Sequence, residues 1–206
     1  MANINVYVDG FNLYYGALKD SPYRWLDLAA LCHQMLPNDN VQTIKYFTAQ
    51  VSARPHDPQQ PSRQQTYLRA LRTIPNVVVV FGQFRTHSCR MVLTGTKPPQ
   101  KVWVDKTSEK GSDVNLAAHL IHDGYQKRFE TAVLVTNDSD LREPVRIVRR
   151  ELGLPIGILN PHQFHSCTLK EHATFVKRIR QSDIAASQFP DELTDKTGKF
   201  HKPAVW

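Results

Sequence analysis

Residues 4–12 read Ile4-Asn5-Val6-Tyr7-Val8-Asp9-Gly10-Phe11-Asn12. The apolar run that ends at Val8 is typical of a buried strand, and the Asp-Gly pair breaks it before a helical pattern begins at Leu13. The same order recurs where the apolar residues Ala132–Thr136 precede Asn137-Asp138-Ser139-Asp140 and another helix. We therefore expect buried strands that are each followed by a helix.

The rest of the chain continues this alternation. Apolar runs predict further strands at Val41–Val51, Val77–Phe81 and Ile156–Leu159, the valine-rich second one covered on both faces. Helical patterns are predicted at Leu26–Leu36, Gln64–Thr73, Gly111–Arg128, from after Asp140 to about Leu152, and at Leu169–Ile179. Apolar strands separated by helices predict an α/β fold with a mostly parallel sheet and helices on both faces.

Two segments do not follow the alternation. Residues 82–108 are expected to form a β-hairpin insertion, in which Arg90–Leu93 pairs with Lys101–Val104 around a Gly- and Pro-containing turn. Residues 183–206 are expected to be a polar C-terminal tail, which carries no periodic pattern and is frayed from Pro190 onward. The prediction is thus one domain over residues 1–182 followed by a tail.

Length and composition exclude several classes of protein. The chain has 206 residues, 41% of them hydrophobic and 22% charged, which suits one folded domain. No apolar run approaches the length of a membrane span. The three cysteines are far apart and make no disulfide framework, so a cytoplasmic location is expected, with no membrane partner.

The formal net charge of +7 is unevenly distributed. Residues 54–110 hold 10 basic and 3 acidic residues, whereas residues 111–140 hold 2 and 5. Basic segments around an acidic one are the charge pattern that a nuclease needs. The candidate residues for binding the phosphates of a nucleic acid, which the family resemblance given below implies is RNA, are Arg85, Arg90, Lys101, Lys110, Arg142 and Arg146. Solvated helix faces are the competing interpretation for Arg142 and Arg146, and Tyr14 and Tyr15 are candidates for base stacking.

Aspartates follow two of the predicted strands. Asp9 comes directly after the first strand, and Asp138 and Asp140 follow the strand at Ala132–Thr136. Because the carboxyl ends of parallel strands share one edge of a sheet, these side chains converge if the strands are neighbours. Asp113, which starts a predicted helix, could approach the same edge. Aspartates at such positions also cap helices, but several on one edge favour a metal site.

An all-oxygen site of this kind suits Mg²⁺ or Mn²⁺ better than zinc. A divalent cation held by aspartates activates water and stabilises the oxygens of an in-line phosphoryl displacement. His162, His165 and Cys167 lie close together in the sequence, but they are one ligand short of a structural zinc site. A catalytic Mg²⁺ or Mn²⁺ site is therefore the expected metal centre.

Three segments resemble the signature blocks of the NYN domain, and more closely of its bacterial LabA-like branch, in the PIN-like nuclease superfamily. The blocks are Val6–Asn12, Glu109–Ala117 and Leu134–Leu141, and the resemblance spans roughly residues 3–180. It implies a PIN-like (Rossmannoid) three-layer fold and a metal-dependent ribonuclease, expected to cut single-stranded or structured RNA endonucleolytically. Carried over by position, the metal-binding residues are Asp9, Asp113, Asp138 and Asp140, with Asn12 as the polar partner of Asp9.

The same comparison leaves one role open and shows two departures. Glu109 either orients a water molecule at the metal or only caps the loop. Asn137 stands where the family usually has glycine, and His172–Phe175 lacks the aspartate that commonly precedes the phenylalanine.

Two functions from different classes follow from the sequence. The first is a metal-dependent endoribonuclease, which the presence of all four aspartates favours. The alternative is a non-catalytic RNA-binding or regulatory module that retains the PIN-like fold. A DNA flap-type nuclease is disfavoured because no arch segment is evident. RNA is the expected partner in both cases, and a homodimer or a regulatory protein partner is compatible with either.

Overall fold

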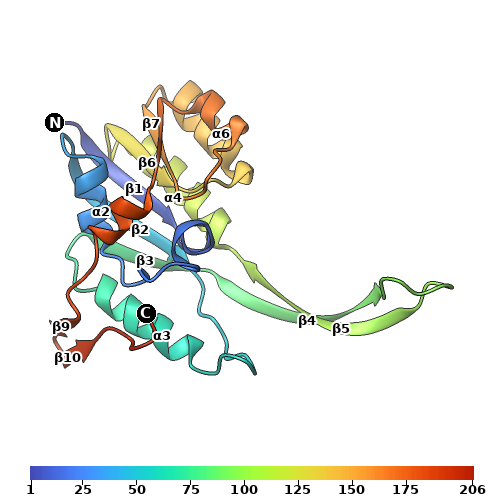
Figure 1. Cartoon of the computed structure of the whole chain (residues 1–206). Helices are drawn as coiled ribbons and strands as arrows, with labels where there is room; N and C mark the ends of the chain where they lie inside the picture. Colours follow the sequence, from blue (N-terminus) through green and yellow to red (C-terminus); the bar gives the residue numbers. More distant parts are fainter.

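Six parallel strands form the central sheet of the computed structural model, which describes residues 1–206 (Figure 1). Their order across the sheet is β3 (Val77–Phe81), β2 (Asn40–Thr48), β1 (Asn3–Asp9), β6 (Thr131–Val135), β7 (Ile156–Asn160) and β8 (Phe175–Arg178). The chain builds outward from β1 in one direction and from β6 in the other. The boundary between β1 and β6 is therefore the topological switch point, where the carboxyl ends of strands leave a crevice.

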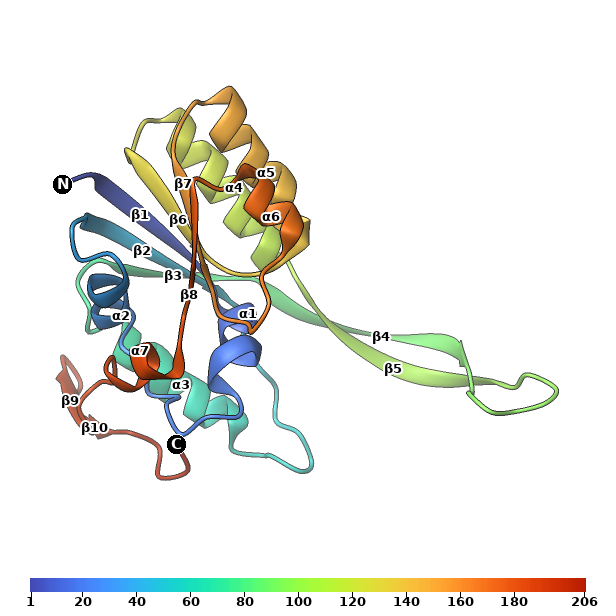
Figure 2. The ribbon, with the colours of Figure 1, turned by 45° about the horizontal axis from the view of Figure 1, so that its top comes forward.

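Helices cover both faces of the sheet (Figure 2). One face carries α1 (Gly10–Leu13), the π-helical turn η1 (Tyr14–Leu18), α2 (Leu28–Met35), α3 (Gln60–Leu71) and α7 (Gln181–Ala185). The other carries α4 (Ser112–Tyr125), α5 (Arg142–Arg146), its π-helical continuation η3 (Ile147–Glu151) and α6 (Cys167–His172). This arrangement confirms the predicted α/β fold, with the three layers of a PIN-like domain.

The alternation of side chains along β1 divides the core in two. Val6 and Val8 pack against the layer of α2 and α3, whereas Tyr7 packs with Leu116 and Leu120 of α4. Successive strand residues point to opposite faces, so a central strand must be apolar on both. None of the helices combines the length and apolar character that crossing a bilayer requires.

The predicted hairpin is present and projects away from the body of the molecule (Figure 1). Strands β4 (Gln83–Val92) and β5 (Lys101–Lys110) pair antiparallel, with Arg90 opposite Trp103 and Val92 opposite Lys101. The predicted pairing of Arg90–Leu93 with Lys101–Val104 is therefore correct, and the ladder continues to Gln83 and Lys110. At its base, the Phe84 ring packs edge-on against Phe11, with ring centroids 5.8 Å apart.

The prediction of a helix over Leu169–Ile179 is wrong beyond α6, which ends at His172. Phe175–Arg178 instead forms β8, which pairs with β7. The Phe175 ring lies over Gly157, where a Cβ would meet its Cζ at 2.1 Å. An aromatic and a β-branched residue suit a strand, and the open edge of β7 supplies the hydrogen bonds.

Two further local predictions differ from the structure. Val77–Phe81 is not covered on both faces, because β3 is an edge strand in which Val78 is 47% and Phe81 37% exposed. Helix α3 begins at Gln60 rather than at Gln64. Pro61 occupies its first turn, where proline costs no hydrogen bond.

The C-terminal segment is not a frayed tail. Strands β9 (Glu192–Asp195) and β10 (Gly198–His201) form a second hairpin, and Phe200 is buried in the core beside Trp25. Trp25 Nε1 donates a hydrogen bond of 2.8 Å to the carbonyl of Pro190. The aromatic anchors of this segment are too widely spaced to form a periodic pattern, so the sequence did not reveal that it packs.

Candidate active site

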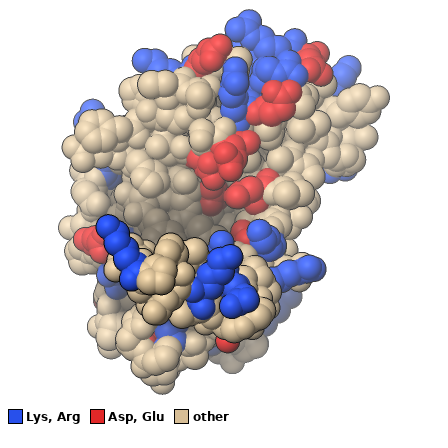
Figure 3. All heavy atoms as spheres, turned by 90° about the vertical axis from the view of Figure 1, so that its right-hand side faces the viewer, with Lys and Arg blue, Asp and Glu red and all other residues tan.

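Three carboxylates come together at the switch point of the sheet. Asp9 ends β1, Asp138 follows β6, and Asp113 lies in the first turn of α4. One oxygen of each lies within 4.8 Å of the other two. Asp9 is buried, Asp138 half-buried and Asp113 exposed, so the group opens to solvent. Figure 3 shows this face with acidic side chains gathered beside a hollow and with Lys and Arg on the hairpin in front of it.

Asp9 is held rigidly by the elements that follow it. Its Oδ1 accepts a hydrogen bond of 2.9 Å from the backbone N–H of Asn12 and so caps α1. Its Oδ2 accepts a bond of 3.1 Å from Thr136 Oγ1. Gly10 permits this turn, because a Cβ there would meet the Phe47 carbonyl oxygen at 2.7 Å. The Asp-Gly pair thus places a carboxylate at the end of β1 in one fixed orientation.

Asn12 joins three segments at the rim of the site. Its Oδ1 accepts a hydrogen bond of 2.9 Å from the backbone N–H of Asn137. His162 Nε2 lies 3.1 Å from the same oxygen, in a hydrogen bond that places the proton on Nε2. Asn137 makes its contact to Asn12 with its backbone N–H, so asparagine can make it as well as the glycine that is usual at this position. His162 therefore belongs to this network, and the residues around His165 and Cys167 do not assemble a metal group.

Asp113 is positioned by the sharp turn into α4. Gly111 adopts a φ of 99°, a left-handed conformation that favours glycine. Glu109 Oε1 then accepts hydrogen bonds from the backbone N–H of Ser112 at 3.1 Å and from Ser112 Oγ at 2.8 Å. Glu109 thus caps the turn, one of the two roles that the sequence left open.

Burial and mutual repulsion disfavour negative charge in the group. Burial raises the pKa of Asp9 to about 6, and the negative charges of Asp113 and Asp138 contribute. Burial and the nearby Asp138, Glu109 and Asp140 also raise the pKa of Asp113. Several carboxylates that repel one another and offer only oxygen ligands fit a hard divalent cation. The residues present therefore fit the expected metal site.

Asp140 does not join the three-carboxylate group. Asp138 caps the short 3₁₀ turn η2 (Ser139–Leu141) by accepting a hydrogen bond of 2.9 Å from the backbone N–H of Asp140. This turn leaves the Asp140 side chain exposed. Its charge still helps to raise the pKa of Asp113, so it lies near the rim of the site.

A cavity of about 500 Å³ adjoins the carboxylates. Tyr14 and Tyr15, the predicted stacking residues, line it. Several further residues that no sequence pattern placed at this site also line the cavity: Arg24, Arg54, Arg63, Tyr46, Tyr67, His162 and Trp206. Arg54 and Arg63 lie at the two ends of a segment that contains Pro55, Pro58 and Pro61. Their basic character was visible in the sequence, but their place in the same cavity as Asp9 was not.

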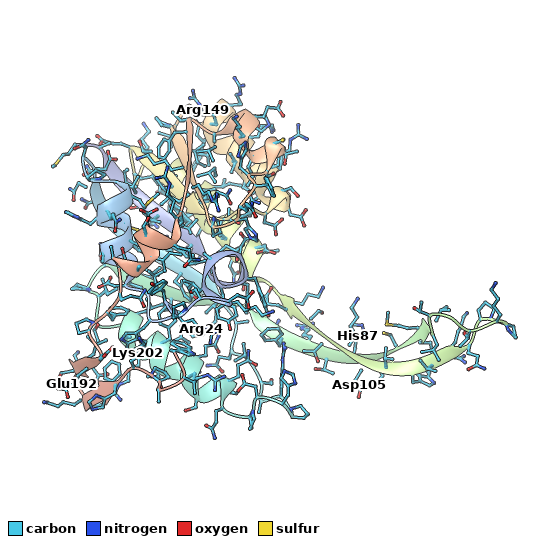
Figure 4. All side chains as sticks on the ribbon, viewed as in Figure 1. Arg24, His87, Asp105, Arg149, Glu192 and Lys202 are labelled. Carbon is cyan, nitrogen blue, oxygen red and sulfur yellow. The ribbon has the colours of Figure 1, made fainter.

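None of the predicted RNA-binding cations lines this cavity. Arg85, Arg90 and Lys101 are exposed on the hairpin, where Figure 4 places His87 and Asp105 far from the body. Arg146 pairs with Glu143 and with Glu151, each at 2.7 Å. These ion pairs favour the interpretation that Arg146 lies on a solvated helix face over the one in which it binds phosphate. Arg149, one turn further, lies far from Arg24 in Figure 4.

Comparison with known proteins agrees with this architecture. Residues 3–179 match the model of the NYN domain family. The 6-hydroxy-3-succinoylpyridine 3-monooxygenase HspA of Pseudomonas putida (strain DSM 28022 / S16) is 29% identical over 234 residues, covering 98% of this chain and 74% of that protein. A protein of unknown function, VPA0982 from Vibrio parahaemolyticus RIMD 2210633, has a similar fold, with a TM-score of 0.58 and 19% identity over 87% of this chain and 93% of that one.

Proposed function

The chain belongs to the NYN domain family, and from this premise we propose that it is a divalent-metal-dependent ribonuclease that cuts RNA endonucleolytically. The observation that carries the proposal is the convergence of Asp9, Asp113 and Asp138, whose oxygens lie within 4.8 Å of one another. Three carboxylates on separate elements repel one another, and a bound cation offsets that repulsion.

Asp9, Asp113 and Asp138 would hold Mg²⁺ or Mn²⁺, which supplies positive charge where the phosphodiester gains negative charge. In the hydrolysis a water molecule loses a proton as its oxygen bonds to phosphorus, the bond from phosphorus to the leaving oxygen breaks, and that leaving oxygen takes up a proton. Thr136 and the backbone of Asn12 hold Asp9 in place for this role. Glu109 keeps the turn before Asp113 closed.

The charge of the hairpin supports RNA as the substrate. Residues 83–110 carry six Lys or Arg and two carboxylates, a net formal charge of +4. Arg85, Arg90 and Lys101 are exposed on this arm, and Lys110 directly precedes the turn into α4. A basic arm next to an acidic centre attracts the phosphates that flank a scissile one. Arg142 is exposed at the start of α5 and is the remaining candidate on that helix.

A second candidate function is the binding and turnover of a small aromatic acid. The name of the Pseudomonas relative specifies a pyridine that carries a succinoyl group, and this chain aligns with it over 98% of its length. The cavity of about 500 Å³, which is lined by tyrosines and arginines, has the size and chemistry for such a compound.

The ribonuclease proposal is tested by incubating labelled single-stranded RNA with the purified protein and Mn²⁺. We expect cleavage by the wild type and its loss in Asp9→Asn and Asp138→Asn. Asparagine keeps the capping oxygen at both positions, so both variants should fold. Asp20→Asn, which changes an exposed aspartate outside the cavity, is the matched control and should cleave like the wild type.

Intact RNA in every wild-type reaction, or equal cleavage by the aspartate variants, would overturn the proposal. Tight RNA binding without any cleavage would instead support the non-catalytic module. Turnover of 6-hydroxy-3-succinoylpyridine by a preparation that leaves RNA intact would support the second candidate.

A further inference from the structure

The cavity beside the carboxylates has a wall that the hydrolysis of RNA does not itself require. Residues 49–59, between β2 and α3, and the first turns of α3 contribute Arg54 and Arg63 to it. Arg24, which precedes α2, lines the same cavity. Asp57 is the one carboxylate that lines the cavity on this segment.

This wall carries three arginines and only one carboxylate to neutralise them. Arg63 Nη2 pairs with Asp57 Oδ2, which accounts for that carboxylate. Arg24 is engaged by neutral partners, since its Nε donates to the Leu18 carbonyl at 3.4 Å and its Nη2 to that of Lys19. The Arg54 side chain is exposed and makes no ion pair. One arginine is thus free to bind an anion, and two others add to the positive potential.

The wall is held in place before any ligand arrives. Gln64 of α3 accepts a hydrogen bond of 2.9 Å from the Val51 N–H and donates one of 2.9 Å to the Ala49 carbonyl. The backbone N–H of Asp57 donates a bond of 2.9 Å to the Arg54 carbonyl and closes a tight turn. A site that is ordered in advance loses less conformational entropy when a ligand binds.

Aromatic rings also line the cavity and offer surfaces on which a planar ligand could stack. Tyr15 is 52% exposed and packs edge-on against Tyr14, with ring centroids 5.3 Å apart and an interplanar angle of 78°. Trp206 and Tyr67 line the same cavity, with centroids 5.9 Å apart. On this wall the side-chain carbonyl of Gln60 is buried and accepts no hydrogen bond. A ligand N–H that reached it would remove the cost of an unpaired acceptor.

We propose that this cavity binds a planar aromatic ring that carries an anionic group, with the ring stacked on Tyr15 and the anion at Arg54. A volume of about 500 Å³ lies within the usual range for small-molecule sites. Two sources supply this chemistry, a nucleotide of RNA and a free aromatic acid. We assign the cavity to the unpaired nucleotide next to the scissile phosphodiester, and this assignment rests on the proposed ribonuclease function. It implies that the RNA must be single-stranded at the cut.

Calorimetric titration of the full chain tests this assignment. The probes are uridine 5′-monophosphate, uridine, ribose 5-phosphate and nicotinate, in EDTA so that no divalent cation holds the phosphate. We expect the monophosphate to bind more tightly than uridine or ribose 5-phosphate, because uridine lacks the anion and ribose 5-phosphate lacks the ring. Arg54→Ala should weaken its binding about tenfold, and Tyr15→Ala about fivefold or more.

Matched controls separate the site from general charge. Arg72→Ala removes an exposed cation from the end of α3, outside the cavity, and should leave binding unchanged. Tyr15→Phe keeps the ring and should retain most of the affinity. Because Tyr15 and Arg54 are exposed, Tyr15→Ala and Arg54→Ala should have the same melting temperature as the wild type.

Binding of nicotinate without binding of the monophosphate would overturn the nucleotide assignment and point to a free aromatic acid. No binding of either probe, or binding that neither Arg54→Ala nor Tyr15→Ala weakens, would overturn the proposed site. These titrations involve no cleavage, so they can fail while the metal-dependent cleavage of RNA stands, and the converse also holds.

Discussion

The hydroxyl group of Thr136 donates a hydrogen bond of 3.1 Å to Oδ2 of Asp9, across the boundary between β6 and β1. Oγ1 of Thr136 in turn accepts a bond of 3.1 Å from the backbone N–H of Asp138. One buried hydroxyl thus connects two members of the carboxylate group. It holds their spacing without adding charge to the site.

Replacing this hydroxyl should loosen the site and leave the fold intact. Thr136→Val has nearly the same shape but leaves Asp9 Oδ2 and the Asp138 N–H without this partner, at a cost of about 1–3 kcal/mol in the free energy of unfolding. We expect lower metal-dependent cleavage of RNA and a lower melting temperature. Thr136→Ser keeps the hydroxyl and should retain most of the activity. Equal activity of the Val and Ser variants would show that the hydroxyl does not position Asp9.

The stability of the metal-free protein should depend on pH through Asp9. Burial raises the pKa of this carboxyl from 3.8 to about 6, so the folded state binds the proton more tightly than the unfolded chain. The stabilisation by this proton is complete below about pH 4, falls as the pH rises toward 6, and is absent above it. The difference between the two pKa values corresponds to at most about 3 kcal/mol.

Asp9→Asn removes this dependence. In EDTA the variant should be more stable than the wild type at pH 8, by up to about 3 kcal/mol, and similar to it at pH 4. Adding Mn²⁺ at pH 8 should raise the melting temperature of the wild type and not that of the variant. Thermal melts at both pH values provide the measurement. A variant that is less stable at pH 8 in EDTA would contradict the raised pKa.

The hairpin should contribute affinity for RNA through its charge. Replacing Arg85, Arg90 and Lys101 together by Ala removes three exposed cations and should weaken RNA binding most at low salt. The slope of log affinity against log salt should fall by about 2, since each phosphate contact to a single strand contributes about 0.7. Equilibrium binding to labelled RNA at several salt concentrations measures this slope.

Charge alone is controlled by a second triple variant. Arg72, Arg150 and Lys196 are exposed and lie outside the hairpin and the cavity. Replacing them by Ala changes the net charge equally and should alter the slope much less. Equal slopes for the two triple variants would reject the hairpin as the RNA-binding element.

The pairing of β8 with β7 should depend on Gly157. In Gly157→Ala the new methyl group would meet the Phe175 ring at 2.1 Å, so the strand or the ring must shift. Overpacking of this kind destabilises by about 1–3 kcal/mol. Phe175→Leu in the same chain makes room and should restore part of the loss. Chemical denaturation of the single and double variants tests this, and additive losses would show that the two positions are uncoupled.

Most of the α/β layout could be predicted because it depends on local patterns. The runs around Val6 and Val133 are apolar on both faces, which marks central parallel strands, and the turn at Gly95 marks the hairpin. The edges of the sheet were harder to predict. β8 owes its conformation to the open edge of β7 and to the space above Gly157, and neither is visible in its own sequence.

The buried network around Asp123 was also hidden in the sequence. Asp123 of α4 accepts a hydrogen bond of 2.7 Å from Tyr7 Oη and pairs with Lys45 and Arg128. Burial raises the pKa of Asp123, but these partners outweigh it and hold the pKa below its ordinary value. Each residue is unremarkable alone, and only the packing of α4 on β1 and β2 brings them together.

The sequence by itself determined most of the strand-and-helix order up to α6 and the identity of the acidic residues, because short-range patterns and the Asp-Gly turn specify them. The tertiary structure decided which carboxylates meet. Strand pairing brings Asp9 and Asp138 together across 129 positions, and the turn at Gly111 adds Asp113, whereas the 3₁₀ turn leaves Asp140 outside. It also decided which cations line the cavity, placing Arg54 and Arg63 there. Distances between residues far apart in the chain depend on how the elements pack, and no local pattern specifies that packing.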